Sequence, residues 1–426
     1  MPERMQAPSA AVPPHKWIFD LLFGSTAAVS WAAAGGLPDG YRAVERFAVL
    51  PAGGDRAFAV SLRSRQGASS AVTSYSALRP FRRRLARSVM GLGLRTGVVQ
   101  MMRPQVEVGV AASPREPTDV LISEYLRGLF GQPVVVSFGC GGGPYRKPVL
   151  QVFSAKGAAL GYVKIGWNDW TREAVRSEAA ALAARASRCG QIGVPDLLHH
   201  TSWRGLDLII TAPLPRRIVR YGMNCPVPST EVLREISGLS QISQSELAGS
   251  EWWLELRGRI KEHVADSAAA ARLVRLTDAV ERLHGRTTLE FGSWHGDLVP
   301  WNLGRFGGRL YAWDWESSAQ SAPLGFDALH FYFQVAFVAR GGPVDEAASF
   351  AVRQAKPALD GLGLADGVHD LLSTLHLLEL TVRHEEARSS SGDCDAHFFP
   401  ASLDAVEHRL DGRPGISFLH PLTSST

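Results

Sequence analysis

One polar segment constrains the fold of this chain more than any other: residues 294–316, with the sequence WHGDLVPWNLGRFGGRLYAWDWE. His295, Asp297 and Asn302 lie in it at the spacing HxDxxxxN, and Asp314 follows between two tryptophans. Short apolar runs on both sides of a Phe-Gly-Gly-Arg turn predict a β-hairpin. Closing that hairpin brings Asn302 and Asp314 close together in space.

These side chains suit phosphate chemistry. An amide oxygen and a carboxylate on adjoining strands are good ligands for a hard cation that keeps several waters. A further carboxylate, that of Asp297, is available to face an attacking hydroxyl. Phosphoryl transfer from a nucleoside triphosphate needs such a set of groups. The pattern HxDxxxxN on its own also occurs by chance in unrelated proteins. The alternative interpretation is therefore a polar loop whose acidic residues have no shared role.

The segment resembles the catalytic core of the aminoglycoside phosphotransferase and choline kinase group, within the protein-kinase-like fold. In that group an HGDxxxxN loop precedes a hydrophobic strand that ends in D-W/F-E. The resemblance implies that Asp297 is the catalytic base and that His295 braces the loop. It also implies that Asn302 and Asp314 bind Mg²⁺.

Two details favour the small-molecule branch of that fold over protein kinases. Gly296 stands where protein kinases have arginine, and residues 314–316 are Asp-Trp-Glu in place of Asp-Phe-Gly. Residues 323–327 match the Gly-x-Pro-x-x-Asp ending of the branch only loosely. A protein kinase is therefore the weaker interpretation.

The elements around the segment agree with this fold. Apolar runs predict a small β-rich lobe over residues 118–215, and residues 216–426 are predicted to be a helical lobe that holds the catalytic loop. We expect an α+β, two-lobed protein-kinase-like fold with an extra N-terminal α/β region. Residues 1–15 are predicted to be a disordered tail, and residues 16–117 an accessory region of no recognised family.

Two charged residues in the β-rich lobe fit the resemblance. Lys164 lies inside an apolar strand, and Glu178 lies in the following helix. In the resembled group, such a lysine binds the α- and β-phosphates of ATP and such a glutamate positions it. Glu173 is a competitor for the glutamate role. Gly141 and Gly142 belong to a degenerate Gly-rich turn that either caps phosphates with backbone N–H groups or is a plain β-turn.

One helix of the accessory region is unusually basic. Residues 79–94 contain five arginines among apolar residues and predict an amphipathic helix. Such a helix either rests on an anionic partner or membrane surface, or presents a solvated face whose arginine stems lie on the core. We favour the second interpretation.

Composition narrows the class of protein. The formal net charge is only +4, which gives no reason to expect nucleic-acid binding. The four cysteines lie far apart without a CxxC pair, which argues against a zinc site or disulfide framework and favours a cytoplasmic location. Residues 17–36 are too polar for a membrane span and make a poor signal peptide.

The sequence therefore predicts a small-molecule kinase that uses ATP and Mg²⁺. The acceptor is an aminoglycoside-, sugar- or choline-like hydroxyl compound, with the choice among them and the oligomeric state left open. Glu379, Glu385 and Glu386 are candidate acceptor-binding acids, although a solvated helix face explains them better. The alternative function is a catalytically weak or inactive kinase-like scaffold.

Overall fold

The structure is a computed structural model that describes residues 14–24, 27–31, 37–53, 56–74, 81–99, 105–111, 121–140, 147–186, 190–263, 268–391 and 397–412. The chain forms two compact units, Met1–Ala179 with Pro195–Ile218, and Ala180–Val194 with Val219–Thr426. Each unit is described by itself. Among the described residues, no helix has the length and apolar character that crossing a bilayer requires.

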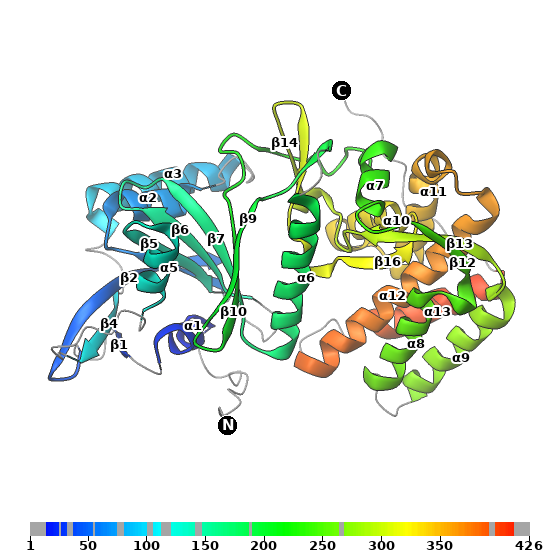
Figure 1. The fold of residues 1–426 in the computed structure, drawn as a ribbon, viewed down its shortest axis with the longest axis horizontal. Helices are drawn as coiled ribbons and strands as arrows, with labels where there is room; N and C mark the ends of the chain where they lie inside the picture. The colour runs from blue at the N-terminus through cyan, green and yellow to red at the C-terminus, as the bar shows by residue number, and fades with distance from the viewer. Residues whose placement is uncertain are drawn as a thin grey trace. The chain divides into compact units, whose positions relative to one another are not determined.

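The first unit is built on one antiparallel sheet, with the strand order β1-β4-β2-β3-β5-β6-β7-β10-β9 (Figure 1). The ladder between β3 and β5, in which Ala59 pairs with Phe138, joins strands that come from residues 16–117 to strands from residues 118–215. The accessory region thus contributes four strands to the same sheet. The predicted domain boundaries stay a prediction. The strands are β1 (Ala28–Trp31), β2 (Tyr41–Gly53), β3 (Arg56–Ser61), β4 (Gln105–Ala111), β5 (Val134–Cys140), β6 (Val149–Ser154), β7 (Ala159–Gly166), β9 (Leu197–Trp203) and β10 (Leu206–Thr211).

Helices pack on both faces of this sheet. Successive side chains of a strand point to opposite faces, so Ala59 joins the core under α1 and α5, whereas Val60 joins the core under α2 and α3. Phe19 of α1 meets the rings of Phe47 and Phe138 edge-on, at centroid distances of 5.4 and 5.1 Å. These helices are α1 (Pro14–Phe23), α2 (Arg65–Thr73), α3 (Phe81–Thr96) and α5 (Ile122–Phe130). A further helix, α6 (Asp169–Ala186), follows β7 in the chain and belongs to the first unit up to Ala179.

The side chains of most arginines of the basic helix α3 lie outside the described residues, so its predicted basic face stays a prediction. Three apolar side chains of this helix, Leu85, Val89 and Leu92, are exposed, with relative exposures of 58%, 66% and 64%. Arg87 instead turns inward, and its Nε donates to the carbonyl of Val72 in α2. The described part of α3 therefore exposes apolar as well as polar side chains, and one of its arginines turns inward.

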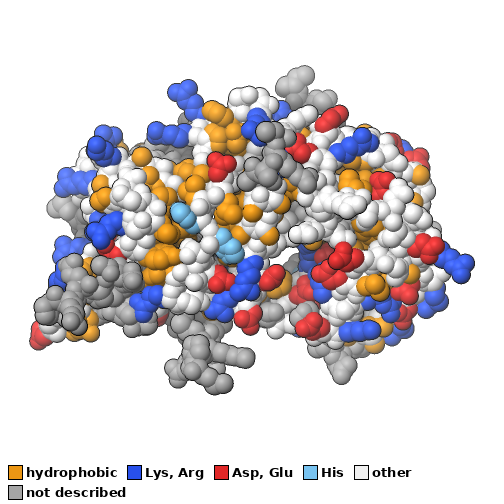
Figure 2. All heavy atoms as spheres, in the orientation of Figure 1, with side chains coloured by type: hydrophobic (Ala, Val, Ile, Leu, Met, Phe, Trp, Pro, Cys, Tyr) orange, Lys and Arg blue, Asp and Glu red, His pale blue; other side chains and the backbone are white. Residues whose placement is uncertain are grey.

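The second unit is mostly helical (Figure 1). On the face drawn in Figure 2, acidic and basic side chains are interspersed over this unit, in line with the mild net charge. Its helices are α7 (Thr230–Ser237), α8 (Glu251–His263), α9 (Ala268–His284), α10 (Phe326–Gln334), α11 (Val344–Leu362), α12 (Asp366–Ser391) and α13 (Phe398–Leu410).

Residues 294–316, the segment with the HxDxxxxN motif, contribute to two small sheets of this unit. One has the order β12-β13-β16 and the other β11-β14-β15-β8. β13 leads into the segment, and its residues pair on both sides, with β12 and with β16. The strands are β8 (Ile192–Gly193), β11 (Val219–Arg220), β12 (Ser243–Glu246), β13 (Thr288–Trp294), β14 (Leu303–Phe306), β15 (Arg309–Ala312) and β16 (Ala319–Pro323).

The predicted α+β class, with one β-rich and one helical part, is confirmed. The predicted hairpin is also present, because Leu303 pairs with Ala312 and Phe306 with Arg309. Its strands are shorter than expected. Pro300 opens a single 3-10 turn before β14, since its missing N–H is tolerated at the first position of a helical turn.

Candidate active site

The catalytic loop follows β13 and turns sharply at Gly296. This residue has φ +79°, and a Cβ built on it would overlap the carbonyl oxygen of Ser317, which follows the Asp-Trp-Glu segment. Only glycine combines that backbone conformation with that close approach. The Gly that distinguishes the motif from that of protein kinases is therefore required by the geometry of the loop.

Asp297 and Asn302 lie in direct contact. The Asn302 Nδ2 donates to the Asp297 Oδ2 at 2.8 Å and to the Asp297 carbonyl at 3.1 Å. Asn302 is buried, whereas the Asp297 side chain is 37% exposed. Because its nitrogen serves the loop, the oxygen of the Asn302 amide is the atom that can ligate a cation.

Asp314 has an unusual backbone. Its φ of 72° and ψ of 54° lie in the left-handed region, which non-glycine residues occupy rarely and at an energetic cost. The hairpin holds it there, since the Trp313 N–H donates to the Asn302 carbonyl at 3.1 Å. A carboxylate oxygen of Glu316 lies within 4.8 Å of one of Asp314. Glu316 is thus a further oxygen donor that the sequence analysis quoted in the motif without assigning it a role.

These donors fit Mg²⁺. Asn302 offers an amide oxygen, and Asp314 and Glu316 offer carboxylate oxygens, which are the hard ligands that this ion prefers. Asn302 and Asp314 come together through the hairpin in the way the sequence predicted. Their role as ligands stays a prediction.

His295 is fully buried behind the loop. Its ring lies on Trp315 at a centroid distance of 4.3 Å, and its Nδ1 accepts the Asp297 N–H at 3.2 Å. Burial lowers the pKa of His295 to about 4, so the ring is neutral at neutral pH. The imidazole therefore holds the backbone of Asp297 as an uncharged acceptor, which is the contact that a bracing role needs.

Asp327 holds the same loop from the other side, and sequence reasoning missed this contact. Its carboxylate accepts the His295 N–H at 2.9 Å and the Gly296 N–H at 3.3 Å from the first turn of α10. Desolvation raises the pKa of Asp327 to about 6, against the opposing effect of these hydrogen bonds. The only signal in the sequence was the loose motif at residues 323–327.

Arg383 of α12 ties two loops together. Its guanidinium donates to the Gly296 carbonyl at 3.1 Å and to the Ser317 carbonyl at 3.2 Å. The same group lies over the Trp294 ring, 4.3 Å from its centroid, and its Nε donates to Glu379 at 2.7 Å. Arg383 therefore connects the catalytic loop, the end of the Asp-Trp-Glu segment and the core of the helical unit.

Glu379, Glu385 and Glu386 of α12 are buried and paired, which corrects the solvated-face interpretation. Glu379 binds Arg259 as well as Arg383, with Oε1 3.0 Å from the Arg259 Nη1. Glu386 also binds Arg259, at 2.7 Å, and Glu385 binds Arg388. These carboxylates are held by arginines within the helical unit, so they do not form a free anionic surface for a cationic acceptor.

Lys164 and Glu178 meet in the first unit. The Lys164 Nζ on β7 lies 2.7 and 2.6 Å from the two carboxylate oxygens of Glu178 on α6. Glu178 is buried, whereas the competing Glu173 is 76% exposed and lies near Arg176 instead. The lysine–glutamate contact expected from the sequence is present, and its role toward a nucleotide stays a prediction. Gly141 and Gly142 lie outside the described residues.

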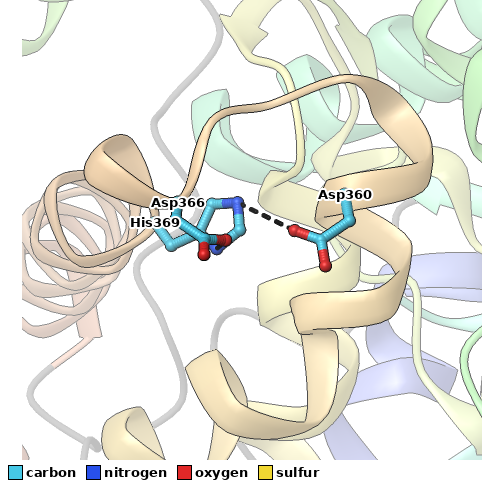
Figure 3. Close-up of side chains that lie close together, drawn as sticks. All are labelled: Asp360, Asp366 and His369. Atoms are coloured by element: carbon cyan, nitrogen blue, oxygen red, sulfur yellow. Dashed lines mark ion pairs between the residues drawn. The ribbon is translucent and has the colours of Figure 1, made fainter.

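A second group of potential metal ligands occurs between α11 and α12. Figure 3 shows the Asp360 and Asp366 carboxylates beside the His369 ring. The Lys356 ammonium contacts both carboxylates, at 3.4 Å from Asp360 and with a close contact to Asp366. We assign the group to an ion pair that ties the end of α11 to the start of α12.

Comparison with known proteins gives no match at the level of sequence families. No protein-family model matches the chain, and no curated protein matches it. Three solved structures illustrate the structural similarity. Choline kinase LicA from Streptococcus pneumoniae has a TM-score of 0.44 at 13% identity, over 64% of this chain and 92% of that chain.

The other two are also small-molecule kinases. Amicoumacin kinase hAmiN, in complex with AMP-PNP, Ca²⁺ and Ami, has a TM-score of 0.42 at 14% identity, over 63% of this chain and 86% of that chain. A thermostable mutant of aminoglycoside phosphotransferase APH(4)-Ia, apo form, has a TM-score of 0.48 at 11% identity, over 68% of this chain and 99% of that chain.

These solved structures include a choline kinase and an aminoglycoside phosphotransferase, the two kinds of enzyme after which the resembled group is named. The chain is similar to the aminoglycoside phosphotransferase and choline kinase group of the protein-kinase-like fold.

Proposed function

We propose that this protein transfers the γ-phosphate of ATP to a hydroxyl group of a small molecule. The observation that carries the proposal is that the Asn302 amide nitrogen binds Asp297 and leaves the amide oxygen available for a cation. Its nitrogen holds the Asp297 carboxylate at 2.8 Å, while Asn302 immediately precedes β14 and Asp314 closely follows β15 of the same hairpin. One amide thus couples a base to a cation site, which is what in-line phosphoryl transfer requires.

Each residue then has a definite task. Asp297 accepts the proton of the acceptor hydroxyl as that oxygen forms a bond to the γ-phosphorus, and the bond from that phosphorus to the bridging oxygen of ADP breaks. Lys164, held by Glu178, binds the α- and β-phosphates. Mg²⁺ held by Asn302 and Asp314 would neutralise charge on the phosphates. Positioning and charge neutralisation supply most of the rate.

The metal assignment is tested by Asp314→Asn. Asparagine tolerates the left-handed backbone of this position, so the variant removes charge with little conformational penalty. We expect turnover of Mg·ATP to fall at least 100-fold, by analogy with the loss of one electrostatic donor at a reacting group. Asp360→Asn, at an exposed acid of the same unit, is the matched control and should retain activity. Undiminished turnover in Asp314→Asn contradicts the assignment.

The acceptor is tested by a phosphate-transfer screen. Aminoglycosides, sugars, choline-like alcohols and amino alcohols are incubated with Mg·ATP, and both ADP and the phosphorylated product are measured. A product that appears with the wild type and disappears with Asp297→Asn supports the proposal. ADP formation without a product would indicate hydrolysis rather than transfer.

The competing function is a kinase-like scaffold without activity. Thermal denaturation with and without millimolar Mg·ATP separates the two functions, because a ligand that binds the folded state raises the midpoint. A raised midpoint that Lys164→Met abolishes supports nucleotide binding. No change in midpoint, together with no product in the screen, favours the scaffold.

A further inference from the structure

We propose that His330 and His376 form a buried relay, a chain of two hydrogen-bonded imidazoles, that orients the Asp297 carboxylate. The inference rests on the proposed function, in which Asp297 is the base. His330 lies on α10 and His376 on α12, and the sequence analysis assigned a role to neither. His330 would act as a positioning residue through Asp297, and His376 through His330.

An unbroken chain of contacts joins His376 to His330 and His330 to Asp297. The His330 Nε2 lies 3.2 Å from the Asp297 Oδ1, and the His330 Nδ1 lies 3.2 Å from the His376 Nε2. Both rings are buried, with relative exposures of 3% and 2%. Because Asn302 holds the Asp297 Oδ2, each oxygen of this carboxylate has a protein partner. A carboxylate held at both oxygens cannot rotate freely about its Cβ–Cγ bond.

The partners determine where the protons lie. An ionised carboxylate only accepts hydrogen bonds, so the His330 Nε2 must carry a proton toward Asp297. Burial and the nearby His330 and Arg383 hold the pKa of His376 well below its usual range, so His376 is neutral. A His330 ring that carries its proton on Nε2 leaves Nδ1 to accept the N–H of the His376 Nε2. The donors then all point toward Asp297.

Packing alone does not explain these two histidines. The rings lie edge-on to aromatic neighbours, with His330 6.3 Å from Trp294 and His376 5.6 Å from Phe326. Apolar side chains would fill such positions without a desolvation cost. Burying two imidazoles costs free energy unless their nitrogens are paired, and the chain of pairs ends at the partly exposed Asp297 carboxylate.

The charged groups that face the relay are few among the described residues. Asp327 lies one turn before His330 on α10 and binds the loop backbone, and Arg383 on α12 binds Glu379 and the loop carbonyls. Each of these groups is engaged with the backbone or with an ion pair. The relay is thus the contact through which α10 and α12 reach the Asp297 side chain.

Three substitutions at His330 separate positioning from packing. His330→Gln places an amide N–H near the position of the imidazole Nε2, His330→Asn places one near Nδ1, and His330→Leu removes both. We expect kcat to fall on the order of 10–100-fold in the Leu and Asn variants, as for outer-shell partners of catalytic groups. The KM for ATP should stay within about twofold, because the relay does not touch nucleotide-binding residues. The Gln variant should recover most of kcat.

The outcomes are distinguishable. If the wild type transfers phosphate and all three variants match it in kcat, the relay has no positioning role. The inference then fails, while the proposed function stands. If Gln is no better than Leu, the donor at Nε2 is not the reason for any loss, and the inference also fails. If the wild type transfers phosphate to no acceptor, the proposed function fails, and the catalytic meaning of the relay fails with it.

A measurement without turnover tests the proton arrangement directly. In protein labelled with ¹⁵N-histidine, long-range NMR correlations should show His330 protonated at Nε2 and unprotonated at Nδ1. Asp297→Asn should shift the His330 resonances, whereas Asp360→Asn should leave them unchanged. A His330 that carries its single proton on Nδ1 would overturn the proposal, and this result does not depend on activity or on the stability of any His330 variant.

Discussion

The close approach at Gly296 makes a quantitative prediction, because the same unit contains a matched glycine. Gly296 and Gly308 both have φ +79°. A Cβ added at Gly308, in the turn of the β14–β15 hairpin, meets nothing within 4 Å, whereas a Cβ added at Gly296 overlaps the Ser317 carbonyl. Gly296→Ala and Gly308→Ala therefore share the backbone penalty and differ only in the clash.

The magnitudes follow from these two terms. An alanine in the left-handed region costs about 1–2 kcal/mol, and this is the whole expected effect of Gly308→Ala. Relieving the overlap at Gly296 requires a backbone shift that costs a further 1–3 kcal/mol or so. The shift would also strain the bonds from the Gly296 N–H to Asp327 and from Arg383 to the Gly296 carbonyl. Gly296→Ala should thus be less stable than Gly308→Ala by about 1–3 kcal/mol.

Urea denaturation followed by tryptophan fluorescence measures the difference. With an m-value of about 2 kcal/mol/M, the midpoints of the two variants should differ by roughly 1 M. Gly296→Ala should also lose most phosphate-transfer activity, because the shift moves Asp297, whereas Gly308→Ala should keep it. Equal midpoints for the two variants would refute the reasoning that Ser317 forbids a side chain at this position.

Two further predictions concern the groups that hold the loop. Glu379→Ala should lower the free energy of unfolding by about 3–5 kcal/mol, since it leaves Arg259 and Arg383 without a shared buried partner; a loss below about 1 kcal/mol in urea denaturation would contradict this. The folded-state pKa of Asp327, about 6, lies above the ordinary 3.8, so the folded state binds this proton more tightly than the unfolded state does. The wild type should therefore lose up to about 3 kcal/mol of stability as pH rises from about 4 to 7. Asp327→Asn should lack this part of the pH dependence, and parallel stability–pH curves would show that Asp327 has no raised pKa.

The parts of the site that the sequence anticipated are close together in the chain. Asp297 and Asn302 are five residues apart, and one hairpin turn separates Asn302 from Asp314. Lys164 and Glu178 are joined by a strand and the helix that follows it. Local turn and strand chemistry decides such distances, so spacing and periodicity are enough to predict them.

The missed residues act across long separations. His330 reaches Asp297 over 33 positions, His376 reaches His330 over 46, and Arg383 reaches the Gly296 carbonyl over 87. No local pattern marks them, because each contact joins residues that lie far apart in the sequence. Their partners depend on how α10 and α12 pack beneath the loop. The same reason explains why the burial of Glu379 could not be predicted.

The sequence by itself determined which polar groups residues 294–316 bring together, the α+β class and the contact of Lys164 with Glu178. All three follow from side-chain type, hydrophobic period and short-range turns. Only the tertiary structure decided that the N-terminal strands extend the β-rich sheet through the pairing of β3 with β5, and that side chains from two helices form a chain of contacts to the Asp297 carboxylate. Strand partners and buried polar contacts between distant helices are chosen by packing of the whole unit, where many pairings satisfy the same local pattern and one buries the most apolar surface with its polar groups paired.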